Sequence, residues 1–252
     1  LIGAVGDDPF GLALKKELRR FGVIDDFVAI DATVASGVAI ILLNEGDNRI
    51  IIDPGANLGI TPRQIDAAFD QVIERGDLFL TQFETNYDAI RYGILKASTS
   101  GMKVIVNPAP AVAIDEYLYR MMDLVILNRT EIQSLTGMSV VAADEARPAM
   151  EELRRRGVDA VILTLGEQGS VLLDGEGSHF VSALPVQAID TTGAGDAYIG
   201  AICQQLASDV PIRQAMKFAT VTAGLTVTKK GVQAAIPTRE EIERQIEIGM
   251  SS

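Results

Sequence analysis

Short apolar runs alternate with amphipathic helical patterns from residue 56 onward. The runs are rich in Leu, Ile and Val and span residues 77–80, 103–107, 124–128 and 160–164. The helical patterns between them cover about 62–75, 86–99, 112–121, 129–136 and 143–156. Strands that are apolar throughout and separated by helices predict an α/β fold with a mainly parallel sheet covered on both faces. Such sheets bind ligands at the carboxyl ends of their strands.

One region breaks this alternation. Residues 37–57, GVAIILLNEGDNRIIIDPGAN, predict two strands joined by a turn at 45–47 and no helix. This β-hairpin follows a helical pattern at about 9–21. A projecting hairpin with two apolar faces must cover a substrate or a partner subunit. We therefore expect a flap at residues 33–55 on a body formed by residues 1–32 and 56–252.

The composition favours a small-molecule ligand. The chain has 252 residues and a formal net charge of −12, which argues against nucleic acid and an anionic membrane as partners. No apolar run approaches the roughly 20 residues of a membrane span, and the one cysteine, Cys203, fits a reducing compartment. We therefore expect a cytoplasmic protein, with Cys203 as a buried apolar residue and His179 on the surface. The sequence starts at Leu1 within a strand-like stretch, so we expect that its beginning has been removed.

The stretch VQAIDTTGAGDAYIGAICQQLA, residues 186–207, places glycines and aspartates between a strand end at 186–189 and a helix evident from Ala197. The start of a helix has N–H groups without partners and a positive dipole end, so it suits an anion. The N–H groups of residues 193–196 would bind a phosphoryl group in transfer, and Asp196 would accept the proton of the attacking hydroxyl. The alternative is an ordinary turn capped by Asp or Thr. Neither a dinucleotide-binding fingerprint nor a P-loop occurs.

Polar residues at three other predicted strand ends allow two interpretations each. Asn128 and Glu131 form a capping pair, or they hold a phosphate and a magnesium-bound water. Thr164, Gly166 and Gly169 lie in the turn of a hairpin over 162–173, or they contact a nucleotide. Glu84 hydrogen-bonds sugar hydroxyls or caps the next helix.

Seven segments, taken together and in this order, resemble the ribokinase-like (PfkB) family of carbohydrate kinases. They are VGDDPFG (5–11), GDNRIIIDPGAN (46–57), NPAPA (107–111), NRTE (128–131), TLGEQG (164–169), DTTGAGDAYIGA (190–201) and VTKKGVQAAIPTREE (227–241). The match covers nearly the whole chain, and DTTGAGD is highly specific. The resemblance implies a three-layer α/β fold with a small β lid, incomplete here, formed by the flap.

The resemblance also implies an activity, namely transfer of phosphate from Mg-ATP to the primary hydroxyl of a pentose, with D-ribose as the expected substrate. Asp196 would be the catalytic base and would contact the sugar, Gly193, Ala194 and Gly195 would form the anion hole, and Glu84 would bind sugar. The nucleotide would lie among Asn128, Thr164, Gly166, Glu167, Gly169 and Thr220, with Asn128 and Glu131 near Mg²⁺. A K⁺ ion would be bound, largely through backbone carbonyls, by Asp190, Thr192, Thr226, Lys229 and Gly231.

The chain departs from the family at two places. Ala235 stands where such kinases often have a serine at the last K⁺ ligand, and the family's opening strand with its sugar-binding segment is absent. Two alternatives follow: a kinase for another sugar or a nucleoside, and a non-catalytic nucleotide-binding remnant. The lid would also provide the contact of a homodimer.

Overall fold

The computed structural model describes residues 1–44, 47–72 and 77–250. It divides into two compact units, one comprising Leu1–Gly76 and Gln82–Met102 and the other Asp77–Thr81 and Lys103–Ser252. We call them unit 1 and unit 2 and describe each by itself.

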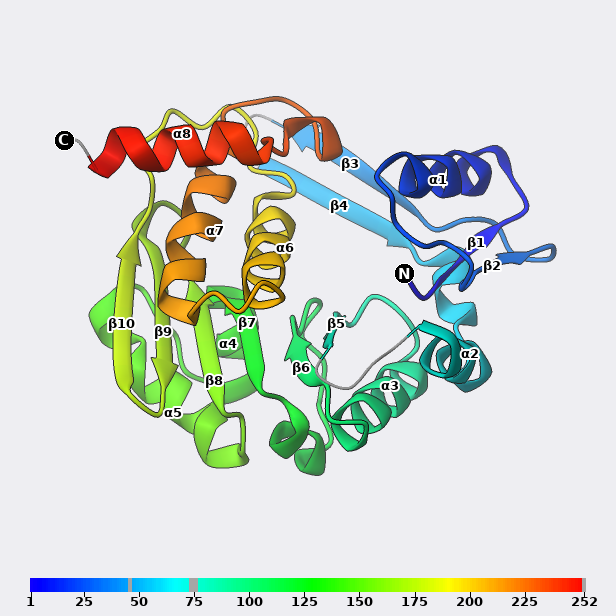
Figure 1. The fold of residues 1–252 in the computed structure, drawn as a ribbon, viewed down its shortest axis with the longest axis horizontal. Coiled ribbons are helices and arrows are strands. Elements are labelled where there is room, and N and C mark those ends of the chain that lie inside the picture. The colour runs from blue at the N-terminus through cyan, green and yellow to red at the C-terminus, as the bar shows by residue number, and fades with distance from the viewer. Residues whose placement is uncertain (45–46, 73–76, 251–252) are drawn as a thin grey trace. The chain divides into compact units, whose positions relative to one another are not determined.

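Unit 2 contains a six-stranded sheet in the order β10-β9-β8-β7-β6-β5 (Figure 1). Its strands are β5 (Leu78–Thr81), β6 (Lys103–Val106), β7 (Leu124–Asn128), β8 (Ala160–Thr164), β9 (Gly169–Asp174) and β10 (Gly177–Ser182). The strands β5 to β8 are parallel, and β9 and β10 are added as antiparallel hairpins. The predicted mainly parallel sheet is therefore confirmed.

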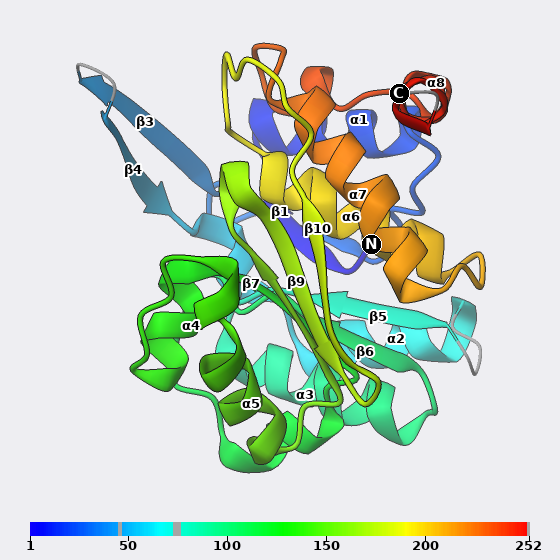
Figure 2. The same cartoon turned by 90° about the vertical axis from the view of Figure 1, so that its left-hand side faces the viewer.

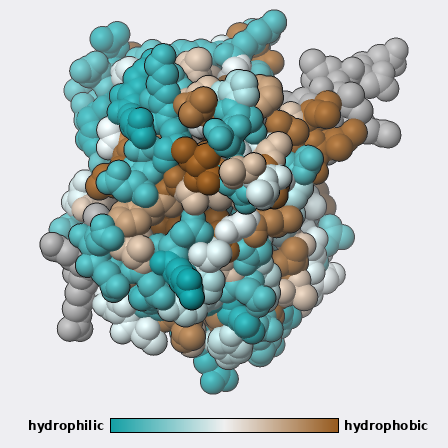
Figure 3. Space-filling view, turned by 90° about the vertical axis from the view of Figure 1, so that its right-hand side faces the viewer, coloured by the Kyte–Doolittle hydropathy of each residue, from teal (hydrophilic) through white to brown (hydrophobic). Residues whose placement is uncertain are grey.

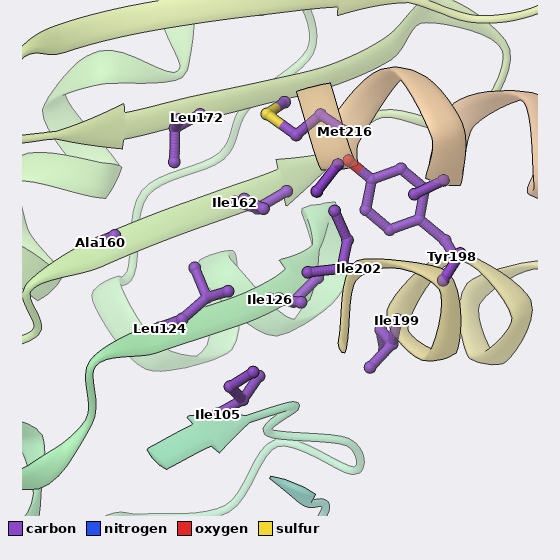
Figure 4. Packing of buried hydrophobic residues seen from close by; sticks show 13 residues of the cluster. Ile105, Leu124, Ile126, Ala160, Ile162, Leu172, Tyr198, Ile199, Ile202 and Met216 are labelled. Atoms are coloured by element: carbon purple, nitrogen blue, oxygen red, sulfur yellow. The ribbon is translucent and has the colours of Figure 1, made fainter. Parts of the chain in front are cut away.

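Helices cover both faces of this sheet (Figure 2). They are α4 (Arg129–Thr136), α5 (Arg147–Arg156), α6 (Ala194–Leu206) and α7 (Ile212–Thr226). A further helix, α8 (Arg239–Met250), packs on α7. Tyr198 and Ile202 of α6 and Met216 of α7 pack on alternate strand residues, among them Ile126 and Ile162 (Figure 4). The neighbouring strand residues are also buried and contribute to the opposite face, which α4 and α5 contact. Burial on both faces explains why these strands are apolar throughout.

The described residues of unit 1 form two small sheets, three α-helices and a 3₁₀ helix, Gly55–Gly59. The parallel pair is β1 (Gly3–Gly6) with β2 (Val28–Asp31), and the antiparallel pair is β3 (Val38–Asn44) with β4 (Asp47–Asp53). The helices are α1 (Pro9–Arg20), α2 (Pro62–Val72) and α3 (Tyr87–Thr99). The predicted hairpin is confirmed, although residues 45–46 of its turn lie outside the described residues, as do residues 73–75 of the helix predicted over 62–75.

The predicted strand end at 186–189 is wrong. The last strand is β10, which we did not predict, and residues 183–192 form a loop whose Ile189 N–H bonds the Val227 carbonyl at 2.7 Å. Pro185 lacks a backbone donor, and Ile189 is 59% exposed, so the apolar residues of this loop do not mark a buried strand. His179 lies in β10 and is half-buried rather than on the surface, because its strand packs against α7.

Two helix predictions need correction. The pattern at 112–121 yields only a 3₁₀ turn, Glu116–Met121, since the prolines and β-branched residues before it favour extended backbone. The pattern at 143–156 is a 3₁₀ turn, Ala143–Glu145, followed by α5, because Pro148 lacks the N–H that a continuous helix would need. The helix expected from Ala197 already begins at Ala194. In the described part of the chain, no helix has both the length and the apolar character needed to cross a membrane.

Candidate active site

The first turn of α6 presents unused hydrogen-bond donors. Gly193 precedes the helix in the left-handed region, with φ of 77°, and a Cβ there would lie 2.8 Å from Val232 Cγ1. No side chain caps this helix start, and the N–H groups of Gly195 and Asp196 meet no acceptor in the described part of the chain. A Cβ on Gly195 would have no heavy atom within 4 Å. Free donors therefore face open space, which is the arrangement that binds an anion.

Asp196 is the third residue of α6, and its carboxylate has no hydrogen bond to the described residues. Although the residue is exposed, partial removal of water from its carboxyl group raises the pKa. No donor stabilises the charged form, so nothing opposes that shift. An unpaired carboxylate of raised basicity is suited to accept a proton from a hydroxyl group.

A buried network links the ends of β6 and β7 to the start of α4. The Asn128 N–H and side-chain amide each donate to the Glu131 carboxylate at 2.8 Å, and the Glu131 N–H donates to Asn128 Oδ1 at 3.0 Å. The Asn107 amide donates to the Ile126 carbonyl at 2.9 Å and also bonds the Glu131 carboxylate. Glu131 is 9% exposed, and burial raises its pKa in spite of these bonds. The capping interpretation of Asn128 and Glu131 is therefore confirmed.

This network also fits the predicted role near Mg²⁺. Its donor set consists of carboxylate and amide oxygens, which Mg²⁺ prefers, and each carboxylate oxygen has a second lone pair for a metal-bound water. In the described residues no group of three or more His, Cys, Asp or Glu side chains could hold a metal directly. Contact through water is thus the form that the residues allow. The sequence did not assign Asn107 to the site, although NPAPA marked the strand end.

The predicted K⁺ ligands lie on two loops that are bonded to each other, except Thr226, which is the last residue of α7. The Asp190 carboxylate accepts from Thr192 N at 3.0 Å and from Gly231 N at 3.3 Å, and hydrogen bonds from the Thr192 side chain, Thr192 N and Gly231 N lower its pKa. The Ile189 and Asp190 N–H groups bond the carbonyl of Val227, the residue after Thr226. Within the described chain, the carbonyls of Asp190, Thr192, Lys229 and Gly231 accept no hydrogen bond. Four free carbonyls on adjoining loops fit a monovalent cation.

Two of these residues have other engagements. The Lys229 ammonium group pairs with Glu241 at 3.0 Å, and the Thr226 hydroxyl donates to the Thr222 carbonyl at 2.8 Å. Their side chains are thus used by the fold, and only their backbones could serve a cation. Ala235 is fully buried and offers no side-chain oxygen.

The nucleotide-side predictions fall around the β8–β9 hairpin and α7. Thr164 ends β8 opposite Asn128, with its hydroxyl 3.3 Å from the Leu127 carbonyl. Gly166 and Glu167 form a 3₁₀ turn, and Gly169 has φ of 115°, where a Cβ would lie 2.0 Å from the Val181 carbonyl oxygen. Glycine at 169 is therefore required by the fold itself.

Thr220 of α7 is 8% exposed, and its hydroxyl has no hydrogen-bond partner in the described chain. A buried hydroxyl without a partner is unfavourable unless a ligand or water binds it. Glu84 belongs to unit 1 and is exposed, and its contact with sugar stays a prediction. No described hydrogen bond joins Asp196 to the Asn128–Glu131 network.

Comparison with known proteins places this geometry in context. The sequence model of the pfkB family carbohydrate kinases matches residues 1–239. The deoxyribokinase of Salmonella typhimurium is 32% identical over 98% of this chain and 81% of its own length. The ribokinase of Schizosaccharomyces pombe is 33% identical over 96% of this chain and 78% of its own. The structure of Arabidopsis thaliana ribokinase with ribose and ATP has a TM-score of 0.87 and 26% identity, covering 96% of this chain and 80% of that one.

Proposed function

The chain belongs to the pfkB family of carbohydrate kinases and is an ATP-dependent sugar phosphotransferase, and from this premise we propose that its substrate is D-ribose, phosphorylated on the primary hydroxyl. The observation that carries the proposed phosphoryl transfer to a hydroxyl group is the start of α6, where free N–H groups lie next to an unpaired carboxylate of raised pKa. Kinase chemistry needs this pair, because charge must be stabilised and a proton removed at nearly the same point.

In the proposed reaction the sugar oxygen forms a bond to the γ-phosphorus while the bond to the β,γ-bridging oxygen breaks and ADP leaves. Asp196 accepts the hydroxyl proton. The N–H groups of residues 193–196 stabilise negative charge on the transferring group. Asn128 and Glu131 would hold the waters of a bound Mg²⁺, which would supply positive charge to the phosphates. The K⁺ ion would lie between the Asp190 and Gly231 loops and fix their geometry beside the anion hole.

The remaining assignments are part of the same proposal. Residues 33–55 serve as a lid on the body formed by 1–32 and 56–252, and the lid also provides a homodimer contact. Thr164, Gly166, Glu167, Gly169 and Thr220 bind the nucleotide, and Glu84 binds sugar. The reaction takes place in the cytoplasm. A second candidate substrate is 2-deoxy-D-ribose, since one relative is named a deoxyribokinase.

The test is ADP release with Mg-ATP and K⁺ in the presence of D-ribose, 2-deoxy-D-ribose, adenosine or no acceptor. We expect release that depends on D-ribose, at least about tenfold above 2-deoxy-D-ribose in kcat/KM if the site hydrogen-bonds the 2-hydroxyl. The Asp196→Asn variant should bind nucleotide but lose turnover, and Asp144→Asn, at an exposed surface carboxylate, should behave as the parent. Preference for another acceptor would change the substrate, and nucleotide binding without turnover on any acceptor would indicate a non-catalytic remnant.

A further inference from the structure

Two of the family segments, VGDDPFG and GDNRIIIDPGAN, have no role in the chemistry described so far. Both belong to unit 1, where the second forms strand β4 and the exit of the β3–β4 hairpin. Among the residues that the structure describes, β3 and β4 pair only with each other, as a two-stranded sheet. Its orientation therefore depends on how its two ends are attached to the rest of the unit.

The hairpin presents apolar side chains on both of its faces. Ile40 and Ile51 are paired opposite each other and are 54% and 55% exposed, and Ile52, on the other face, is 59% exposed. The face of the molecule in Figure 3 likewise carries exposed apolar side chains among polar ones. Because Ile40, Ile51 and Ile52 are each more than half exposed, their packing contributes little to the position of the hairpin, which therefore depends on its attachment.

The entry to β3 is held by hydrogen bonds to the carboxylate of Asp8. Asp8 Oδ1 accepts from Gly11 N at 2.8 Å and from the Ser36 hydroxyl at 2.9 Å, and Asp8 Oδ2 accepts from Ser36 N at 2.7 Å. The Ser36 hydroxyl in turn accepts from Gly6 N at 2.9 Å. Ser36 is only 4% exposed. Asp8 thus connects the end of β1, the start of α1 and Ser36, which lies two residues before β3.

The exit of the hairpin meets the entry at the same point. Ala56 N donates to the Ala35 carbonyl at 2.8 Å, and a Cβ on Gly55 would lie 2.4 Å from that carbonyl oxygen. A Cβ on Gly6 would lie 2.4 Å from Ser36 N and 2.5 Å from the Asp8 carboxylate. The backbone segments are therefore in direct contact where the Asp8–Ser36 bonds form, and a side chain at position 6 or 55 would obstruct them.

We propose that Asp8 is a positioning residue of the kinase, which fixes the angle of the β3–β4 hairpin through Ser36 so that the hairpin can contact the bound sugar. The inference rests on the proposed function of the hairpin as a lid. The hydrogen bonds that hold Asp8 also keep its carboxyl pKa low, so the attachment stays charged at neutral pH. Asp8 itself does not touch the reacting atoms.

The experiment uses a single tryptophan in the hairpin, because the chain has none of its own. Position 52 is exposed and lies opposite the small Ala39, so Ile52→Trp should report hairpin motion with little disturbance of the structure. In this background Asp8→Asn removes an acceptor for Ser36 N but keeps the size of the side chain. Asp7→Asn is the matched control, since the Asp7 side chain is exposed and makes no described hydrogen bond. Fluorescence anisotropy without sugar and the KM values for sugar and ATP are measured for each variant.

We expect Asp8→Asn to lower the tryptophan anisotropy and raise the KM for sugar by about tenfold, with the KM for ATP changed less than about twofold. Asp7→Asn should match the parent in all three. Equal anisotropy and sugar KM in the Asp8 and Asp7 variants would overturn the proposal, as would an Asp8 variant whose kcat and both KM values change together. If no sugar is phosphorylated even by the parent, the proposed function fails, and the anisotropy alone decides whether Asp8 fixes the hairpin.

Discussion

Replacement of Gly195 by alanine should make the fold more stable and the kinase slower. Gly195 is the second residue of α6, its φ is not positive, and a Cβ there would meet no heavy atom within 4 Å. Alanine therefore fits without strain. It also restricts the unfolded chain, which is the reason such substitutions stabilise proteins.

The size of both effects can be estimated. Substitution of glycine by alanine at a compatible site contributes about 0.4–1 kcal/mol, which raises the Tm of a chain of this size by about 1–4 °C. The new methyl group tilts toward the start of the helix. It would enter the space in front of the free N–H groups and displace the phosphoryl group from them, so we expect kcat to fall about 100-fold, as when one donor to a developing charge is removed.

The assay pairs thermal unfolding with steady-state ADP release on the same preparations. Gly200→Ala is the matched control, because Gly200 is an exposed glycine of the same helix with equally open space around it. Gly200→Ala should raise the Tm to a similar extent and leave kcat unchanged. A Gly195→Ala enzyme with the parent kcat would refute the anion hole, and a lowered Tm would refute the description of the helix start.

Three further predictions concern single positions. Gly193→Ala should destabilise the fold by about 1–2 kcal/mol in chemical denaturation, because its φ of 77° is unfavourable for alanine and Val232 obstructs the methyl group; unchanged stability would contradict this. Asp196→Asn should lower kcat by about 10²–10⁴-fold. In the parent, kcat should fall as the pH is lowered through the pKa of Asp196, because the ionised form is the base, and partial removal of water raises this pKa above the ordinary 3.8 of an aspartate. A pH-independent kcat would argue against this role. Asp25 pairs with Lys15 and with Arg19, each at 3.0 Å, and the hydrogen bonds from Arg19 and Lys15 lower its pKa to about 2. The stability that it contributes is therefore present above about pH 4 and is lost as the pH falls toward 2. Asp25→Asn should make the free energy of unfolding depend less on pH in that window than it does in the parent.

Periodicity in the sequence predicted those elements that are buried in a simple way. The strands β6, β7 and β8 are apolar on both faces, so their runs had one interpretation, and turn residues marked the β3–β4 and β8–β9 hairpins. The pattern failed where apolar residues are exposed or where a strand is only half-buried. β10 has alternating exposure, and Ile189 is apolar but lies in an exposed loop.

The candidate site was predictable in type but not in its connections. The glycines and Asp196 at the start of α6 follow from local sequence, because a helix start needs only neighbouring residues. The bond of Asn107 to Glu131 and that of Asp190 to Gly231 join residues far apart in the chain. Such pairs depend on how strands and loops are arranged in the fold, which spacing along a sequence does not specify.

The helix starts of this protein differ in a way that argues for a ligand at α6. The starts of α1, α3 and α4 are closed by the side chains of Asp8, Asn86 and Asn128, each of which accepts a backbone N–H. The starts of α5 and α7 lack such a side chain, but a proline at each removes one of the donors that would need a partner. At α6 there is neither a capping side chain nor a proline, and the residue before the helix is Gly193, whose left-handed backbone favours glycine. Since side-chain caps stabilise helices, and α1, α3 and α4 have them, we propose that the donors left open at α6 bind a group only during the reaction.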